Sequence, residues 1–205
     1  MKRTWVEWFI NQPQGHYFSK ISDAYLQDNF NFYSLRKYVP NYKQALDMIR
    51  GQYYSPNDPN RSADWPSNLE AAAIKLYGLL HQRYLLTSSG LKDMYKKYEK
   101  NEFEKCPRVN CKGHQCLPYG EFDEPGKESL RMFCPCCGEL YLPSDKSGIL
   151  RDIDGAYFGS SWVLLFLQSY SEIKEVKIPI DTRLFGFKIE FEDDEYEEEE
   201  EDCNY

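Results

Sequence analysis

Hydrophobic side chains recur every three or four positions through the first hundred residues, a spacing typical of helices that pack on a core. The first helical segment opens with Thr4 three residues before Glu7, a capping-box pattern that marks a helix start. Shorter helices are predicted at 22–30 and at 40–51, where a glycine ends the pattern. This part of the chain is therefore predicted to be all-helical.

The strongest helical pattern is NLEAAAIKLYGLLHQRYLL, at 68–86. Ser67 and Glu70 form a second capping box at its start, and apolar residues follow one side of the helix. A further helix is predicted at 89–103. His81 lies in the middle of the long helix, and we interpret it as a packed or half-exposed side chain.

The pattern changes at Cys106, where short strand-like segments separated by Gly and Pro begin. Three strands are predicted within 116–122, 128–135 and 138–143. An apolar helix follows and includes the run WVLLFL at 162–167.

The last patterned stretch, RLFGFKIEF, alternates apolar and polar positions and is predicted to be a strand. Its aromatic face has two interpretations. It can pack on the chain's own sheet, or it can dock on a partner, since clustered aromatic side chains are common anchors of interfaces. Gly186 would let a second backbone approach the strand.

Composition indicates a folded protein, since 41% of the 205 residues are apolar and 16% are aromatic. The net charge of −8 comes from 190–202, which holds 11 acids and no base. Without that segment, 22 acids face 25 bases, a balance of +3. The longest apolar run is too short to span a bilayer, and the first 14 residues lack a secretory signal. We therefore expect the cell interior, where thiols stay reduced.

Four cysteines have the spacing of a zinc site. Cys106 and Cys111 form one pair, Cys134 and Cys137 form a second pair, and 22 residues separate the two pairs. Two short loops that each hold two sulfurs can close a tetrahedron around one Zn²⁺. Cys136 lies between the second pair and is predicted to point elsewhere.

A site closed by four thiolates leaves no position for water or substrate, so this zinc is predicted to be structural, one ion per chain. His114 is an alternative ligand, but its spacing is no better than that of Cys111. A metalloenzyme is disfavoured because the closed ligand set leaves no position for a substrate. Together these patterns predict an α+β fold. We expect a helical domain at 1–104 and a three-stranded zinc ribbon at 105–162. A C-terminal helix with a docking segment is expected at 163–189, and a disordered acidic tail at 190–205.

Zinc ribbons often bind nucleic acid, which requires an excess of basic over acidic residues. Between residues 104 and 146 there are six bases and seven acids, which is no basic patch for phosphate. The ribbon instead carries more apolar side chains than it can bury, which favours a protein interface. The sequence also lacks the GxSxG, HExxH, phosphate-loop and kinase motifs, and its three histidines are scattered, so no catalytic activity is predicted. A zinc-ribbon nucleic-acid-binding or transcription protein remains the alternative.

Several stretches together resemble the casein kinase II regulatory (beta) subunit family. They are YLQDNFN, VPNYKQALDMI, LYGLLHQRYLLT, CPRVNC, LPYG, the CP-C pair at 134–137, DGAYFG and RLFGFKI. They occur in the family's order from about residue 5 to residue 189. The combination is specific, although each stretch alone is weak.

The resemblance implies a non-catalytic regulator of a Ser/Thr protein kinase. It implies a homodimer joined through the ribbons, with interface positions at Pro107, Val109, Leu140 and Pro143. It further implies that the C-terminal segment docks on separate catalytic (alpha) subunits, giving a two-plus-two tetramer that directs activity toward protein substrates.

The docking anchors implied by the resemblance are Phe185 and Phe187, the first standing where the family usually has tyrosine. A location in the cytoplasm and nucleus, with no membrane association, is expected.

The sequence departs from the family in three places. The N-terminus lacks the family's phosphorylated serines, the acidic loop after the ALDMI helix is replaced by RGQYYSPNDPNRSADW, and Lys43 stands where the family has an arginine of a destruction-box-like motif. The acidic tail is also unusual for the family. One hypothesis is that 190–202 replaces the lost loop and competes for a basic cleft on the catalytic subunit. The other is that this run of like charge only solvates the chain end.

Overall fold

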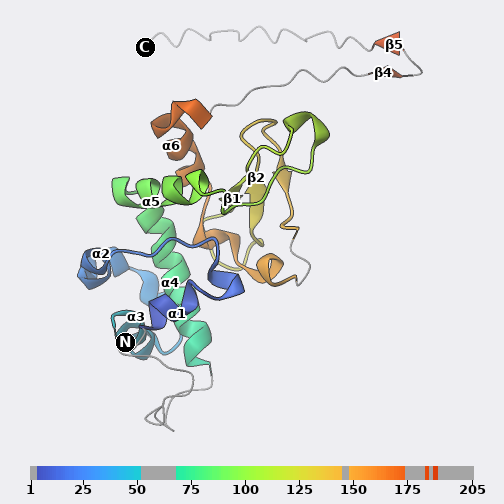
Figure 1. Cartoon of the computed structure of the whole chain (residues 1–205). Helices are drawn as coiled ribbons and strands as arrows, with labels where there is room; N and C mark the ends of the chain where they lie inside the picture. Colours follow the sequence, from blue (N-terminus) through green and yellow to red (C-terminus); the bar gives the residue numbers. More distant parts are fainter. Residues whose placement is uncertain (1–3, 52–67, 145–147, 174–182, 185–186, 189–205) are drawn as a thin grey trace, which may run out of the picture.

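The computed structural model describes residues 4–51, 68–144, 148–173, 183–184 and 187–188. The protein is α+β, with helices along the first hundred residues and a small three-stranded antiparallel sheet after them. Figure 1 shows the long helix α4 running through the middle of the helices, with the sheet beside the end of α4 that leads into α5.

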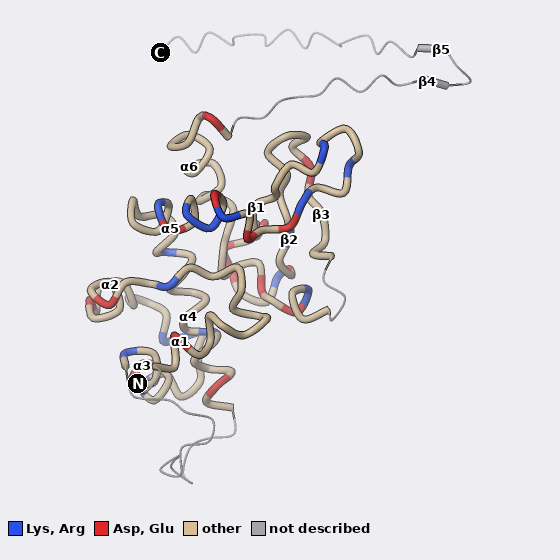
Figure 2. Tube along the Cα trace, viewed as in Figure 1, with Lys and Arg blue, Asp and Glu red and all other residues tan. Residues whose placement is uncertain are grey.

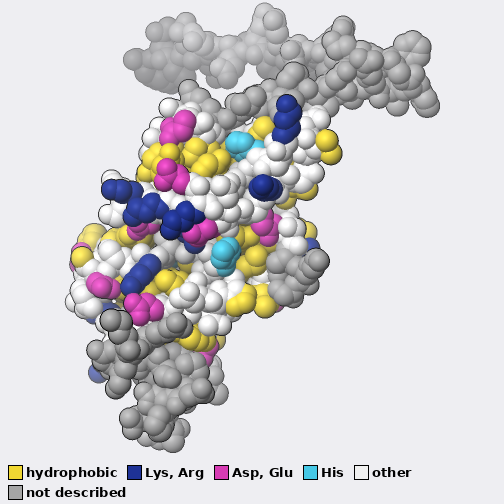
Figure 3. Space-filling model, in the orientation of Figure 1, with side chains coloured by type: hydrophobic (Ala, Val, Ile, Leu, Met, Phe, Trp, Pro, Cys, Tyr) yellow, Lys and Arg dark blue, Asp and Glu magenta, His cyan; other side chains and the backbone are white. Residues whose placement is uncertain are grey.

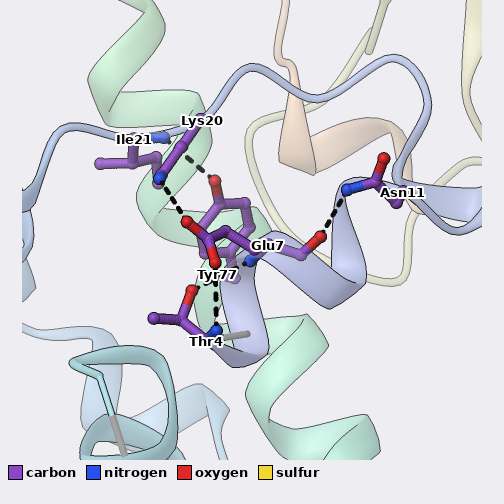
Figure 4. A network of polar contacts seen from close by, with 6 residues as sticks. All are labelled: Thr4, Glu7, Asn11, Lys20, Ile21 and Tyr77. Carbon is purple, nitrogen blue, oxygen red and sulfur yellow. Dashed lines mark hydrogen bonds and ion pairs between the residues drawn. The ribbon is translucent and has the colours of Figure 1, made fainter. Parts of the chain in front are cut away.

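Helix α1 (Trp5–Phe9) begins with the predicted capping box. The backbone N–H of Glu7 donates to Thr4 Oγ1 at 3.2 Å, and the N–H of Thr4 donates to Glu7 Oε2 at 3.2 Å. Figure 4 shows how this helix is tied to its surroundings, because Glu7 Oε1 also pairs with Lys20 Nζ at 3.2 Å. The next residue, Ile21, donates its N–H to the hydroxyl of Tyr77 on α4 at 3.0 Å.

Two short helices follow α1 along the chain, as predicted. Helix α2 (Asp23–Gln27) is capped by Ser22, whose hydroxyl accepts from the N–H of Tyr25. Helix α3 (Tyr42–Ile49) ends before Gly51, whose φ of +113° stops the helix. Single 3₁₀ turns connect these helices, at η1 (Pro13–Gly15), η2 (Asn29–Phe32) and η3 (Leu35–Tyr38).

Helix α4 (Leu69–Leu85) is buried on more than the one side that the sequence pattern predicts. It packs against α3, α5 (Ser88–Glu99) and η6 (Gly155–Tyr157), so that few of its side chains face solvent. The capping box predicted at its start stays a prediction. The N-cap is Asn68, whose side chain makes no capping bond and instead accepts from Asn41 Nδ2 at 2.9 Å. Ser67 lies outside the described residues.

The sheet contains three strands in the order β1-β2-β3. Leu117 lies opposite Phe133, and Met132 lies opposite Tyr141. Leu117 and Met132 point into the core and are at most 1% exposed. The strands fall where the sequence predicts them and are shorter, at β1 (Leu117–Tyr119), β2 (Arg131–Phe133) and β3 (Leu140–Tyr141).

Helix α6 (Ser161–Ser169) joins the sheet to the helices. The indole N–H of Trp162 donates to the carbonyl of Pro118 on β1 at 3.0 Å, and Tyr170 stacks on Tyr95 of α5 with ring centroids 4.0 Å apart. None of the described helices, α6 included, combines the length and apolar character needed to cross a membrane. The flanking 3₁₀ turns are η5 (Ile149–Asp152) and η7 (Ser171–Ile173).

The C-terminal strand is not continuous, which corrects the prediction from alternation. Strand β4 (Arg183–Leu184) pairs antiparallel with β5 (Phe187–Lys188), so the chain turns back between them. This hairpin is a separate two-stranded sheet. Gly186, predicted as a point of close approach, lies outside the described residues.

Candidate metal centre

Four cysteine sulfurs from two distant loops meet beside the sheet. The Sγ atoms of Cys106, Cys111, Cys134 and Cys137 all lie within 4.8 Å of one another, and those of Cys106 and Cys137 are 4.0 Å apart. A Zn²⁺ ion bound at 2.3 Å by four tetrahedral sulfurs would hold them about 3.8 Å apart. The cluster therefore fits a zinc ion with small adjustments of the side chains.

The first pair of cysteines is brought together by a 3₁₀ turn, η4 (Val109–Cys111). The N–H of Cys111 donates to the carbonyl of Arg108 at 3.0 Å. The chain then reverses through Lys112 and Gly113, with φ values of +50° and +73°. The carbonyl of His114 accepts from the N–H of Cys106 at 2.7 Å and closes the loop.

The second pair lies in a tight turn between β2 and β3. The N–H of Gly138 donates to the carbonyl of Cys134 at 2.8 Å, and the N–H of Cys134 donates to the carbonyl of Glu139 at 3.0 Å. Gly138 has a φ of +73° and open space around the position of a Cβ. Backbone conformation, rather than lack of room, therefore requires glycine here. Cys136 is buried and is not a member of the four-sulfur cluster.

Electrostatics oppose the ionisation of several cysteines of the cluster at once. Burial, with the neighbouring thiols, raises the pKa of Cys111 to about 12 and also raises the pKa of Cys134. Burial also acts to raise the pKa of Cys137, but hydrogen bonds to its sulfur outweigh the effect of burial. Hydrogen bonds from the Tyr141 hydroxyl, 3.4 Å from the sulfur, and from the Glu139 backbone lower its pKa to about 6. Four thiolates so close together require a multivalent cation to offset their repulsion.

The donor set determines what this site can do. All four donors are sulfurs, and three of the cysteines are no more than 5% exposed. Neither His114 nor Cys116 belongs to the cluster. The His114 ring nitrogen lies 3.5 Å from the hydroxyl of Tyr98, and Cys116 is 1% exposed within the core. A four-sulfur site that is filled by its own ligands stabilises a fold and leaves no position for a reacting molecule.

Apolar side chains stand exposed around the cluster. Val109 is 89% exposed and Leu140 is 42% exposed, and Pro107 is also on the surface. Pro143, the fourth predicted interface position, is buried within the chain, and its carbonyl accepts from Arg151 Nε at 3.1 Å. Leu142 is 52% exposed and was absent from the predicted interface positions. The role of these residues in a dimer interface stays a prediction.

Only one of the two predicted docking anchors lies among the described residues. Phe187 is the first residue of β5. Phe185 lies outside the described residues. Their docking role stays a prediction.

The interpretation of His81 as a packed side chain is confirmed, although its hydrogen bonds were not predicted. Its side chain is fully buried, and its Nε2 accepts from the N–H of Ser19 at 3.1 Å while its Nδ1 lies 2.9 Å from the carbonyl of Tyr157. The carbonyl can only accept, so Nδ1 carries the proton and the ring is neutral. Burial lowers the pKa of His81 to about 4, which agrees with this assignment. The signal was its position four residues after Tyr77, on the same helix face.

Charges around the sheet are mixed. Figure 2 shows basic and acidic residues interspersed along the chain near β1, β2 and β3. The face in Figure 3 likewise carries Lys and Arg next to Asp and Glu. Glu128 pairs with Arg131, and Glu124 pairs with Lys127 at 3.6 Å. This distribution agrees with the even charge count and gives no support to a phosphate-binding surface.

The fold and the site define an α+β protein whose small antiparallel sheet carries four clustered cysteines that could hold a metal ion. Comparison with known proteins identifies the family. The family described as "Casein kinase II regulatory subunit" matches residues 4–188. The chain belongs to this family, whose members are non-catalytic subunits.

Individual relatives show how far the similarity extends. "Casein kinase II subunit beta" of Schizosaccharomyces pombe is 40% identical over 90% of this chain and 78% of its own length. "Casein kinase II subunit beta'" of Drosophila melanogaster is 37% identical over 91% of this chain and 84% of its own length. "Putative casein kinase II subunit beta-4" of Arabidopsis thaliana is 38% identical over 91% of this chain. The matched region spans 65% of that plant relative's length.

Proposed function

We propose that this protein is a zinc-dependent homodimer that binds the catalytic subunit of casein kinase II and modulates its stability, activity and choice of substrate. The observation that carries the proposal is the four-sulfur cluster inside a chain that matches the regulatory family from residue 4 to residue 188. Cys106, Cys111, Cys134 and Cys137 would hold one Zn²⁺ per chain. The bound ion supplies structural cross-linking and no reaction step.

The role proposed for zinc follows from the size of the sheet. Its three strands have only two or three residues each, too few to hold two long loops in place without a further link. Structural zinc sites contribute on the order of 10–16 kcal/mol to folding in small modules. The ion would fix both loops and, with them, the exposed apolar surface formed by Pro107, Val109, Leu140 and Leu142.

Dimerisation through that surface is supported by the exposure of Val109. A valine that is 89% exposed gains nothing from its own chain, whereas burial at an interface stabilises by about 25 cal/mol per Å² of apolar area. Replacing Val109 by Asp should therefore leave the folded chain intact and give a monomer by light scattering. Phe122→Asp is the matched control, since Phe122 is 48% exposed on another loop. A dimer that survives Val109→Asp would contradict this interface.

The zinc assignment can be tested with adjacent cysteines. Cys134→Ser removes a member of the cluster, whereas Cys136→Ser changes a buried cysteine two residues away that is outside it. We expect one zinc per chain and a dimer for the Cys136→Ser variant, and loss of both for Cys134→Ser. Elemental analysis and native mass spectrometry measure both quantities. Equal zinc content in the two variants would refute the ligand set.

Binding to a catalytic subunit is the decisive test of function. Mixing the chain with the casein kinase II catalytic subunit should give a complex whose mass equals two copies of each. Substituting Phe187 by Ala should weaken this complex and leave the dimer intact. A catalytic subunit that stays free at micromolar concentrations would overturn the proposal. A salt-dependent DNA complex would instead favour the nucleic-acid-binding alternative. We propose that the protein acts in the cytoplasm and nucleus.

A further inference from the structure

A rigid loop projects from the helical part of the protein. Arg50 donates through Nε to the carbonyl of Leu26 at 2.8 Å and through Nη2 to Asn29 Oδ1 at 2.8 Å. Arg83 of α4 donates through Nη1 to the carbonyls of Asn31 and Tyr33, at 2.7 and 2.9 Å. Two guanidinium groups therefore fix the backbone between residues 26 and 33, and the loop has a defined shape.

The loop presents two aromatic side chains outward. Phe30 is 82% exposed and Tyr33 is 77% exposed. They are the most exposed aromatic side chains in the part of the chain that the structure describes. An aromatic ring held outward on a fixed backbone is a typical interface anchor, because little conformational entropy is lost when it is covered.

A hollow of about 520 Å³ is lined by residues that follow the loop in the sequence. Its lining includes the exposed bases Arg36 and Lys43 and no acid: Arg36, Val39, Asn41, Tyr42, Lys43, Gln44 and Leu46. No carboxylate of the described residues forms an ion pair with either base. The phenol of Tyr42 experiences the charges of Arg36, Arg50 and Arg83 together, although burial dominates and raises its pKa. Basic residues near α3 are visible in Figure 2.

Phe30, Tyr33, Arg36, Lys43 and the hollow form what we call the basic-aromatic surface. Its natural complement is an extended peptide that alternates carboxylates with aromatic rings. Such a segment exists in this chain, since EFEDDEYEEEEED at 190–202 combines 11 acids with one Phe and one Tyr and contains no base. We propose that the basic-aromatic surface binds residues 190–202 of the same copy of the chain.

The length of the chain permits this contact. Asn41 in the hollow bonds to Asn68 at the start of α4, whereas Glu172 bonds to Tyr95 on α5, beyond the other end of α4. Helix α4 has 17 residues and is about 25 Å long. Ten residues outside the β4–β5 hairpin connect Ile173 to residue 190, and an extended chain of that length spans about 33 Å. The acidic segment is itself 13 residues long, so its far end can reach beyond this distance.

Zero-length carbodiimide cross-linking of the full protein tests the contact, because it joins a carboxylate only to an amine in direct contact. We expect tail peptides to be linked to Lys43 at least five times more often than to Lys92, which is similarly exposed on α5. Arg36→Glu leaves the Lys43 amine in place and should reduce this yield at least fivefold. Lys92→Glu, the matched control, should not reduce the yield at Lys43.

Two further arms separate docking from general attraction between charges. Phe30→Ser, at a position that contributes almost nothing to the core, should reduce the Lys43 yield about twofold by removing an aromatic contact. Mixing isotopically labelled and unlabelled protein identifies which copy supplies the tail. Cross-links spread evenly over surface lysines, a yield insensitive to Arg36→Glu, or cross-links found only between copies would each overturn the proposal.

Discussion

At Gly78, replacing glycine by alanine should destabilise the protein, although this substitution normally stabilises a helix. Gly78 lies in the interior of α4, and in an exposed helix Gly→Ala stabilises by about 1 kcal/mol. Here a Cβ would lie 2.3 Å from Cγ of Tyr157, far inside the 3.5–4.0 Å of a normal carbon contact. The Tyr157 ring would have to move by more than about 1 Å.

That movement is opposed by the neighbours of Tyr157. Its carbonyl lies 2.9 Å from His81 Nδ1, and the next residue, Phe158, is 1% exposed. Overpacking costs about 1–3 kcal/mol and a weakened hydrogen bond costs about 1 kcal/mol. After the helix gain of about 1 kcal/mol is subtracted, Gly78→Ala should lower the free energy of unfolding by about 2 kcal/mol.

Urea unfolding followed by circular dichroism measures this value. The control is a Tyr157→Ala background, where the ring is absent and Gly78→Ala should become stabilising by about 1 kcal/mol. If Gly78→Ala stabilises the otherwise unchanged protein, the close packing of α4 on η6 is refuted.

Three further predictions concern other contacts. The folded pKa of His81, about 4, lies below the ordinary 6.5, so its contribution is complete above pH 6.5 and is lost as pH falls toward 4. The advantage of the unchanged protein over His81→Gln in unfolding free energy should shrink by about 3 kcal/mol between pH 7 and pH 4, and a constant difference would contradict a buried neutral ring. Thr4→Ala should cost about 1 kcal/mol in the same assay through loss of the capping box, with Thr4→Ser as the control that keeps it. Gly120→Ala should prevent normal folding, measured as soluble yield, since its Cβ would lie 1.9 Å from the carbonyl oxygen of Gly155; a normal yield would disprove that approach.

The sequence predicted features that depend on local chemistry. The box at Thr4 and Glu7, the stop at Gly51 and the turn at Gly138 were predictable because neighbouring residues determine each of them. The four cysteines that meet are also those selected by spacing, because short loops limit which sulfurs can approach one another.

Features that depend on distant contacts were not predictable. The bond between Asn41 and Asn68 at the start of α4 joins residues 27 positions apart, which no local pattern indicates. The burial of Pro143 depends on how the chain returns through Arg151. The C-terminal stretch alternates perfectly, yet alternation alone does not distinguish one strand from two halves of a hairpin.

Glu104 connects the helices to the end of the sheet. One oxygen accepts from the hydroxyl of Tyr17 at 2.9 Å, and the other accepts from the N–H and the hydroxyl of Ser144, both at 2.8 Å. A single carboxylate thus links two residues that are 127 positions apart in the sequence. Moving the end of the sheet away from the helices would break these three hydrogen bonds.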